Sequence, residues 1–66
     1  MHIIVNGAEY KMPEGASLGA LLERLSMDAA RVAVERNGAL VRRADFPRAP
    51  LSDGDRLEIL HFVGGG

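Results

Sequence analysis

The sequence contains no cysteine among its 66 residues. This absence excludes disulfide bonds, thiolate nucleophiles, persulfide relays and cysteine-based metal sites. If the protein handles a reactive group, that group must be a carboxylate, an amine or a hydroxyl.

An excess of charge of one sign is also missing. Eight Lys and Arg residues stand against nine Asp and Glu residues, the formal net charge is −1, and the one short basic block is Arg42-Arg43. Non-specific binding to nucleic acid relies on several clustered contacts from Lys and Arg to phosphates. We therefore expect no nucleic-acid partner.

Long hydrophobic runs are absent as well. No stretch approaches the roughly 20 apolar residues that cross a bilayer as a helix, and the segment after Met1 lacks the charged and apolar regions of a signal peptide. We expect a cytoplasmic protein with no membrane partner.

The short chain limits what the fold can enclose. A domain of this size buries about 60% of the surface that its unfolded chain exposes. A ligand pocket of about 300 to 1,000 Å³ would take much of that core. We therefore do not expect a self-contained enzyme, and we assign no catalytic residue.

Turn signals divide the chain into short elements. Asn6-Gly7 and Asn37-Gly38 are strong hairpin signals, and each lies between two strand-like segments. Strands are predicted over residues 2–6, 8–12, 32–36, 39–43 and 56–62. Residues 44–50 hold two prolines and predict a loop with room for one helical turn.

One helix is predicted after Ser17, which is a suitable N-cap residue. Apolar residues recur at i, i+3, i+4 and i+7, the period of a helix with one apolar face: Leu18, Leu21, Leu22 and Leu25. A single helix must bury that face against the sheet. The predicted fold class is therefore α+β, with two layers.

Strand alternation predicts which residues meet the helix. The expected core joins the four leucines to Ile3, Val5, Val32, Val34, Leu57 and Ile59. Residues of the opposite parity point away from the helix, and among them are Ile4, Leu60 and Phe62. Exposed apolar clusters often mark partner surfaces, although single exposed apolar residues are ordinary. We interpret these three residues as a docking patch.

The chain ends in Val63-Gly64-Gly65-Gly66, directly after the last predicted strand. A glycine run can pass through a channel too narrow for side chains, and four extended residues span at most about 14 Å. A free α-carboxyl, with a pKa of about 3.3 to 3.7, is ionised at neutral pH. We expect a domain over residues 1–63 and a flexible tail over 64–66 that a partner enzyme uses as a substrate. A frayed terminus is the alternative.

Other polar residues give weaker signals. His2 and His61 are too few to predict a metal site, and Asp53-Gly54-Asp55 falls far short of a calcium-binding loop, so we expect a turn there and no metal. Glu35 and Arg36 either contact a partner or form a solvated strand end. These two interpretations stay open.

Several motifs together resemble the bacterial sulfur carrier proteins of thiamine thiazole biosynthesis, the ThiS family. The resemblance is carried by Val34-Glu35-Arg36-Asn37-Gly38, by the segment from Leu51 through Asp53-Gly54-Asp55 to Ile59, and by His61-Phe62-Val63-Gly64-Gly65-Gly66. It extends over the whole chain. It implies a ubiquitin-like β-grasp fold, a mixed sheet of about five strands packed on one helix.

The resemblance also implies a mechanism in which the chain is a carrier and not an enzyme. An adenylating enzyme, like those that activate ubiquitin, consumes ATP and converts the C-terminal carboxylate to an acyl-adenylate. A sulfur donor such as a cysteine desulfurase replaces AMP, and thiazole synthase takes the sulfur. Gly66 would bear the sulfur as a thiocarboxylate, Gly64 and Gly65 would thread the partner active sites, and no cofactor would be bound.

Two other functions stay open at this point. One is a sulfur carrier of another pathway, such as the small subunit of molybdopterin synthase. The other is a β-grasp adaptor that binds through its sheet face, or a ubiquitin-like modifier that is joined to lysines.

Overall fold

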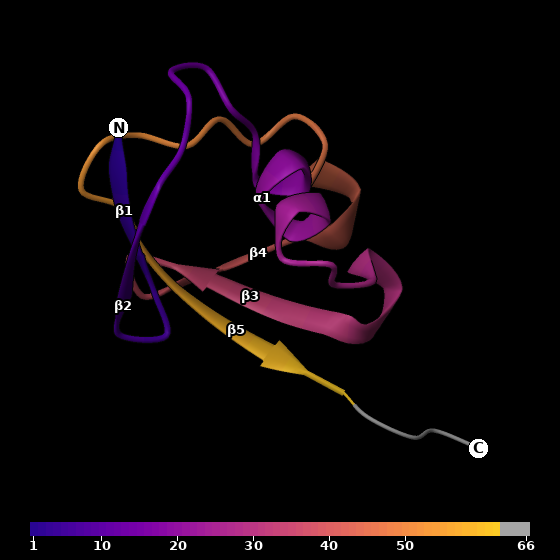
Figure 1. Ribbon diagram of the computed structural model, residues 1–66. Coiled ribbons are helices and arrows are strands. Elements are labelled where there is room, and N and C mark those ends of the chain that lie inside the picture. The colour runs from indigo at the N-terminus through magenta and orange to yellow at the C-terminus, as the bar shows by residue number, and fades with distance from the viewer. Residues whose placement is uncertain (63–66) are drawn as a thin grey trace.

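The computed structural model describes residues 1–62 (Figure 1). Its elements are β1 (His2–Val5), β2 (Ala8–Lys11), α1 (Leu18–Arg24), the 3-10 turn η1 (Ala29–Arg31), β3 (Val32–Arg36), β4 (Ala39–Val41), the 3-10 turn η2 (Arg43–Asp45) and β5 (Arg56–His61). The α+β fold with one helix and five strands is therefore confirmed.

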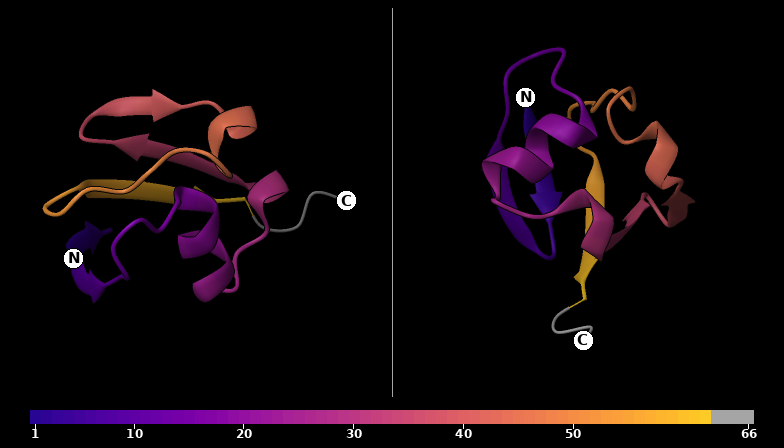
Figure 2. Two further views of the ribbon diagram at one scale, coloured as in Figure 1. Left: turned by 90° about the horizontal axis from the view of Figure 1, so that it is seen from above. Right: turned by 90° about the vertical axis from the view of Figure 1, so that its right-hand side faces the viewer.

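The five strands form one twisted sheet in the order β2-β1-β5-β3-β4. β1 pairs with β5 in parallel, and the other neighbours are antiparallel, so the sheet is mixed. β5, the last strand in the chain, lies in the middle of the sheet between β1 and β3 (Figure 2). The strand that leads to the glycines is therefore the one most enclosed by neighbours.

Four of the five predicted strands end earlier than expected, β4 by two residues and β1, β2 and β5 by one. β4 ends at Val41, since the chain turns into η2 at Arg43. The Arg43 side chain donates hydrogen bonds to the carbonyls of Ala29, at 2.9 Å, and Val32, at 3.2 Å. These bonds hold η2 against η1 and the start of β3. The helical turn predicted within the loop of residues 44–50 is η2, at the beginning of that loop.

α1 begins as predicted, because the Ser17 hydroxyl accepts a hydrogen bond from the Ala20 amide at 3.1 Å. Its buried side chains are Leu18, Leu21 and Leu22, whereas Leu25 is the C-cap residue and is half-buried. No helix within residues 1–62 is long and apolar enough to span a membrane.

The core contains all six predicted strand residues and three of the four leucines. It also contains Met12, Phe46 and Leu51, which the sequence did not predict. These three residues lie in segments or at strand ends without an apolar period, so local patterns gave no signal for them. They complete the core beyond the residues that strand and helix periodicity place there.

Candidate functional site

The three predicted tail residues, Gly64, Gly65 and Gly66, lie outside the described residues. The structure describes the strand that leads to them. The Phe62 amide donates to the Arg31 carbonyl at 2.7 Å, which continues the pairing of β5 with β3 by one residue. The chain is thus held on the sheet as far as residue 62, and the end of β5 lies at the opposite end of the molecule from the N-terminus (Figure 1).

Two asparagine side chains anchor β5, one from each side. The Asn6 side chain donates to the Ile59 carbonyl at 3.1 Å and accepts from the Ile59 amide at 2.8 Å. The Asn37 side chain accepts from the Arg56 amide at 2.9 Å. Both asparagines have a positive φ, of 49° and 51°. The two Asn-Gly turns therefore close their hairpins and also hold the central strand.

Asp55 is a buried carboxylate at the start of β5, with 5% of its surface exposed. It accepts hydrogen bonds from the Ser52 amide at 2.8 Å and the Asn37 side chain at 3.1 Å. The Arg36 guanidinium lies 2.9 Å away. The predicted Asp53-Gly54-Asp55 turn is thus fixed by its second aspartate, which joins it to the β3–β4 hairpin.

The electrostatics of Asp55 follow from these contacts. Burial acts to raise the pKa of the carboxyl, but the hydrogen bonds from Ser52 and Asn37 and the charge of Arg36 outweigh burial and hold the pKa below its usual value. Asp55 was predicted as part of a turn, but its burial was not predicted. A signal existed, because position 55 has the inward parity of Leu57 and Ile59.

The predicted docking residues lie on the outer face of the sheet but do not all meet. Leu60 is 61% exposed and Phe62 is 53% exposed, whereas Ile4 is half-buried. Ile4 is in register with Arg56, four residues from Leu60, which is about 13 Å along a strand. The structure therefore leaves Ile4 apart from the other two.

Leu40 was not predicted at this surface, and at 72% it is the most exposed large apolar residue within the described range 1–62. It lines a shallow hollow of about 370 Å³ with Leu60, Ala33, Ile59, Glu35 and Glu58. Its register opposite Glu35 places it there. We call Leu40, Leu60 and Phe62 the outer apolar patch.

Glu35 and Arg36, for which one pair of interpretations was left open above, point to opposite faces of the sheet. Arg36 has the inward parity of Val34 and reaches Asp55, so its role is structural. Glu35 points to the outer face, directly opposite Glu58 of β5. Neither glutamate forms an ion pair with another residue in the range 1–62.

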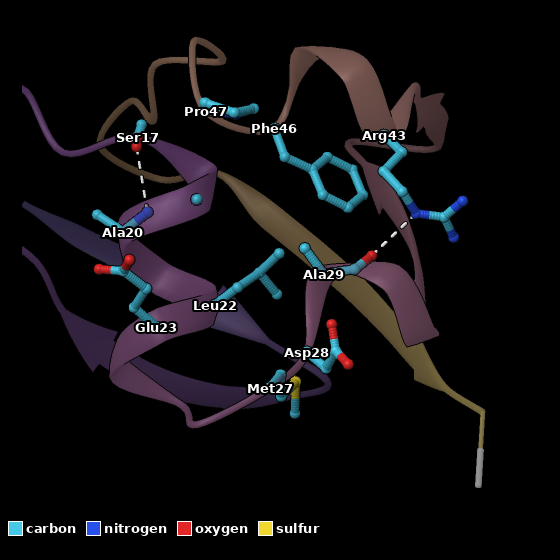
Figure 3. Close-up of a pocket in the computed structure, with 11 residues that line it drawn as sticks. Ser17, Ala20, Leu22, Glu23, Met27, Asp28, Ala29, Arg43, Phe46 and Pro47 are labelled. Carbon is cyan, nitrogen blue, oxygen red and sulfur yellow. Dashed lines mark hydrogen bonds between the residues drawn. The ribbon is translucent and has the colours of Figure 1, made fainter. Parts of the chain in front are cut away.

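A second, larger hollow of about 570 Å³ lies between α1, η1 and η2 (Figure 3). The Phe46 ring and Leu22 point into it, with Glu23, Asp28 and Arg43 around it. Arg43 is already bonded to the Ala29 carbonyl. The packing on the α1 side is close, because a Cβ added to Gly19 would lie 3.3 Å from the Phe46 carbonyl oxygen.

Metal-binding side chains do not gather in the part of the chain that the structure describes. No three of its His, Asp and Glu residues are placed to hold a metal ion together. His2 lies 2.8 Å from the Glu9 carboxylate on neighbouring strands, and His61 is exposed on β5.

Comparison with known proteins shows the family to which this chain belongs. The model of the ThiS family matches residues 3–66. The chain belongs to the ThiS family. Its ThiS-family relatives include the sulfur carrier protein ThiS of Bacillus subtilis, which is 33% identical over 63 residues that cover 94% of this chain and 96% of that protein. This family consists of carriers and not of enzymes, in agreement with the prediction.

The ThiS fold is confirmed by a solved structure. The crystal structure of the thiamine biosynthesis protein ThiS from Geobacter metallireducens superposes with a TM-score of 0.82 at 36% sequence identity, and the match covers all of both chains. The predicted β-grasp architecture is therefore correct.

Two relatives are longer proteins that are named as enzymes. The thiazole synthases of Paramagnetospirillum magneticum and Magnetococcus marinus are each 39% identical to this chain over 66 residues. This ThiS-family chain spans about one fifth of their length, since the match covers 20% of each protein.

Proposed function

We propose that this ThiS-family chain is a sulfur carrier of thiamine thiazole biosynthesis and that the carboxylate of Gly66 bears the sulfur. The observation that carries the proposal is the extent of the family match, which runs over residues 3–66 and so includes all three glycines. The Bacillus subtilis relative named as a sulfur carrier supports it.

The chemistry needs two steps, because a carboxylate is a poor electrophile. In the first, a Gly66 carboxylate oxygen attacks the α-phosphorus of ATP on an adenylating enzyme, and pyrophosphate leaves. In the second, sulfide-level sulfur adds to the acyl carbon and AMP leaves with the carboxyl oxygen. Where the sulfur arrives as an enzyme persulfide, an acyl disulfide forms first, and a thiol reductant must cleave its S–S bond. The product is a thiocarboxylate, and Gly64 and Gly65 have no side chains to obstruct the narrow approach to the enzyme.

The partner that takes the sulfur is thiazole synthase in this proposal. Support comes from the two relatives of that name, each of which includes a segment similar to this entire chain. A cysteine desulfurase is the proposed source of the sulfur, and the carrier, which has no cysteine, offers no competing thiol to the activated carbonyl.

The proposal predicts a change of mass. Incubation of the protein with ATP, an adenylating enzyme and a sulfur source should replace one oxygen by sulfur at Gly66. Mass spectrometry of the intact chain and of its C-terminal peptide measures this exchange, and omission of ATP is the control. An unchanged mass, with an enzyme shown to load another ThiS-family carrier, would contradict the proposal.

The docking surface is the second part of the proposal. We propose that Ile4, Leu60 and Phe62 contact a partner, with Leu60 and Phe62 nearest to the tail. Leu60→Asp should weaken partner binding by about 1–3 kcal/mol, because it places a charge in an apolar contact. The free energy of unfolding should change by less than about 1 kcal/mol, since Leu60 is 61% exposed. Calorimetric titration and urea unfolding measure the two effects. An unfolded variant would refute the assignment of Leu60 to the surface.

A further inference from the structure

Both side-chain amides of this chain stand directly before a glycine. The sequence contains two asparagines, Asn6 and Asn37, and no glutamine, and the residues that follow them are Gly7 and Gly38. Glycine has no Cβ, so its backbone nitrogen can approach the side-chain carbonyl carbon of the preceding asparagine with little hindrance. An Asn-Gly pair is therefore a setting that favours deamidation of the asparagine.

Deamidation needs only water as a co-reactant. The glycine nitrogen attacks Cγ of the asparagine, a C–N bond forms, and the side-chain NH2 leaves as ammonia with the proton of the glycine nitrogen. Water then opens the succinimide ring at one of its two carbonyls. The product is aspartate if the bond from nitrogen to Cγ breaks, and isoaspartate if the bond from nitrogen to the backbone carbonyl carbon breaks.

Packing does not shield either turn. A Cβ added to Gly7 or to Gly38 would meet no atom within 4 Å, and Asn6 and Asn37 are both exposed. Water therefore has access to both asparagines. Protection of the folded chain has to come from the hydrogen bonds that hold the two side chains.

The Asn6 side chain takes the place of a backbone partner of β5. β1 ends at Val5, and the Asn6 backbone amide donates to the Leu57 carbonyl at 2.9 Å. The amide and the carbonyl of Ile59 bond to the Asn6 side chain instead, at 2.8 and 3.1 Å. The NH2 group that leaves in deamidation is the donor to the Ile59 carbonyl, so the reaction breaks this bond.

Asn37 is held in a similar way on the other side of β5. Its side chain accepts from the Arg56 amide at 2.9 Å and donates to the buried Asp55 carboxylate at 3.1 Å. The group that would leave is again a donor in use. A carboxylate at position 37 would place a second negative charge against Asp55, where like charges oppose each other.

We infer that Asn6 and Asn37 are deamidation sites that the attachment of β5 protects, and that deamidation of either one weakens that attachment permanently. The inference does not rest on the proposed function. Local opening of the sheet frees the two side-chain amides, and chemical change of an opened chain is irreversible. At position 6 the new carboxylate faces the Ile59 carbonyl, so two acceptors meet without a hydrogen between them.

The rates of deamidation test the protection. In native buffer at mildly alkaline pH, both sites of the wild-type chain should react about ten- to hundredfold more slowly than in peptides of residues 1–11 and 32–42, because each site first has to break its hydrogen bonds. Such short peptides do not form a stable sheet. In urea that unfolds the chain, protein and peptides should react equally fast.

Peptide mapping by mass spectrometry measures the two sites separately, because cleavage after Lys11 and Arg36 divides them. Each event raises the mass by about one dalton, since OH replaces NH2. Equal rates in the native chain and in the peptides would overturn the inference. This measurement needs no variant, so it decides the matter even if a substituted chain does not fold.

Two substitutions reproduce the aspartate product. Asn6→Asp and Asn37→Asp should each lower the unfolding midpoint by about 5–15 °C. Ser26→Asp is the matched control, because Ser26 is exposed and also has a positive φ, of 57°, but lies beyond the end of α1 and away from β5. Its midpoint should stay within about 3 °C of the wild type.

An exchange of donor and acceptor tests the contact at position 37. Asn37→Asp combined with Asp55→Asn restores one amide and one carboxylate, and it should recover about half or more of the midpoint that Asn37→Asp loses. No recovery would overturn the inference at this site, because the loss would not arise from the contact with Asp55. Wild-type midpoints for Asn6→Asp and Asn37→Asp would overturn the claim that deamidation weakens the attachment of β5.

Discussion

Deletion of Gly65 and Gly66 should abolish sulfur loading while the free energy of unfolding stays within about 0.5 kcal/mol of the wild-type value. The deletion moves the terminal carboxylate back by two residues, up to about 7 Å along an extended chain. A misplacement of about 1 Å can cost a hundredfold in rate, so the shortened carboxylate cannot reach the α-phosphorus of ATP. Stability is spared because glycine has no side chain to bury.

The measurement pairs two experiments on the same truncated chain. Intact mass spectrometry after incubation with ATP, enzyme and sulfur source should show no exchange, and urea unfolding should give the wild-type midpoint. Replacement of Gly65 and Gly66 by alanines is the matched control, because it keeps the reach and adds only Cβ atoms. Sulfur loading of this alanine variant should be slowed but not abolished, because only the added Cβ atoms obstruct the narrow approach to the enzyme. Sulfur on the truncated chain would contradict the role of Gly66, and a large loss of stability would show that the tail belongs to the fold.

Substitution of Asp55 should have the largest effect on stability. Asp55→Ala removes the hydrogen bonds from Ser52 and Asn37 and leaves the partly buried Arg36 without its partner. Loss of one member of such a network typically costs about 2–4 kcal/mol. A domain of this size is stabilised by about 3–10 kcal/mol, so the variant should lose a large share of its stability. Urea unfolding at neutral pH measures the loss.

Asp53→Ala is the control for this substitution, because Asp53 lies in the same turn but is exposed and accepts one hydrogen bond, from the His2 amide at 2.7 Å. Its cost should stay below about 1.5 kcal/mol. Equal losses for the two aspartates would show that the turn, and not the buried carboxylate, carries the stability.

The lowered pKa of Asp55 adds a pH dependence with a definite sign. The folded chain holds this carboxylate ionised below the ordinary pKa of 3.8, so the unfolded chain binds more protons in that range. The stabilisation by Asp55 is therefore complete above the unfolded pKa and is lost as the pH falls through the folded pKa. The difference in stability between the wild type and Asp55→Asn should shrink below about pH 4, as urea midpoints across pH 2–7 can show.

Local patterns were sufficient for most of the fold. The two Asn-Gly pairs located both hairpins, the leucine spacing located α1, and Ser17 proved to be the N-cap. Strand parity identified six core residues correctly. These predictions succeed because turn conformation and the side-chain periods of 2 and 3.6 are set by neighbours in the chain.

The same turn signals and side-chain periods did not predict the contacts between distant segments. Phe46 and Leu51 are buried, although their segments have no period. Asn6 bonds to Ile59, 53 residues away, and Leu40 joins Leu60 across β3. Each depends on the sheet order and register, which follow from how all five strands pack together.

The features of the candidate site also fall into those that local sequence predicts and those that depend on contacts between distant segments. The sequence by itself determined that the chain is a ThiS-family β-grasp protein ending in three glycines, because the family motifs are continuous stretches of residues. The tertiary structure alone decided that Ile4 lies apart from Leu60, that Arg36 turns inward to Asp55, and that Glu35 faces Glu58. The physical reason is strand register, since a sheet brings together residues that lie far apart in the chain and fixes which of their side chains share a face.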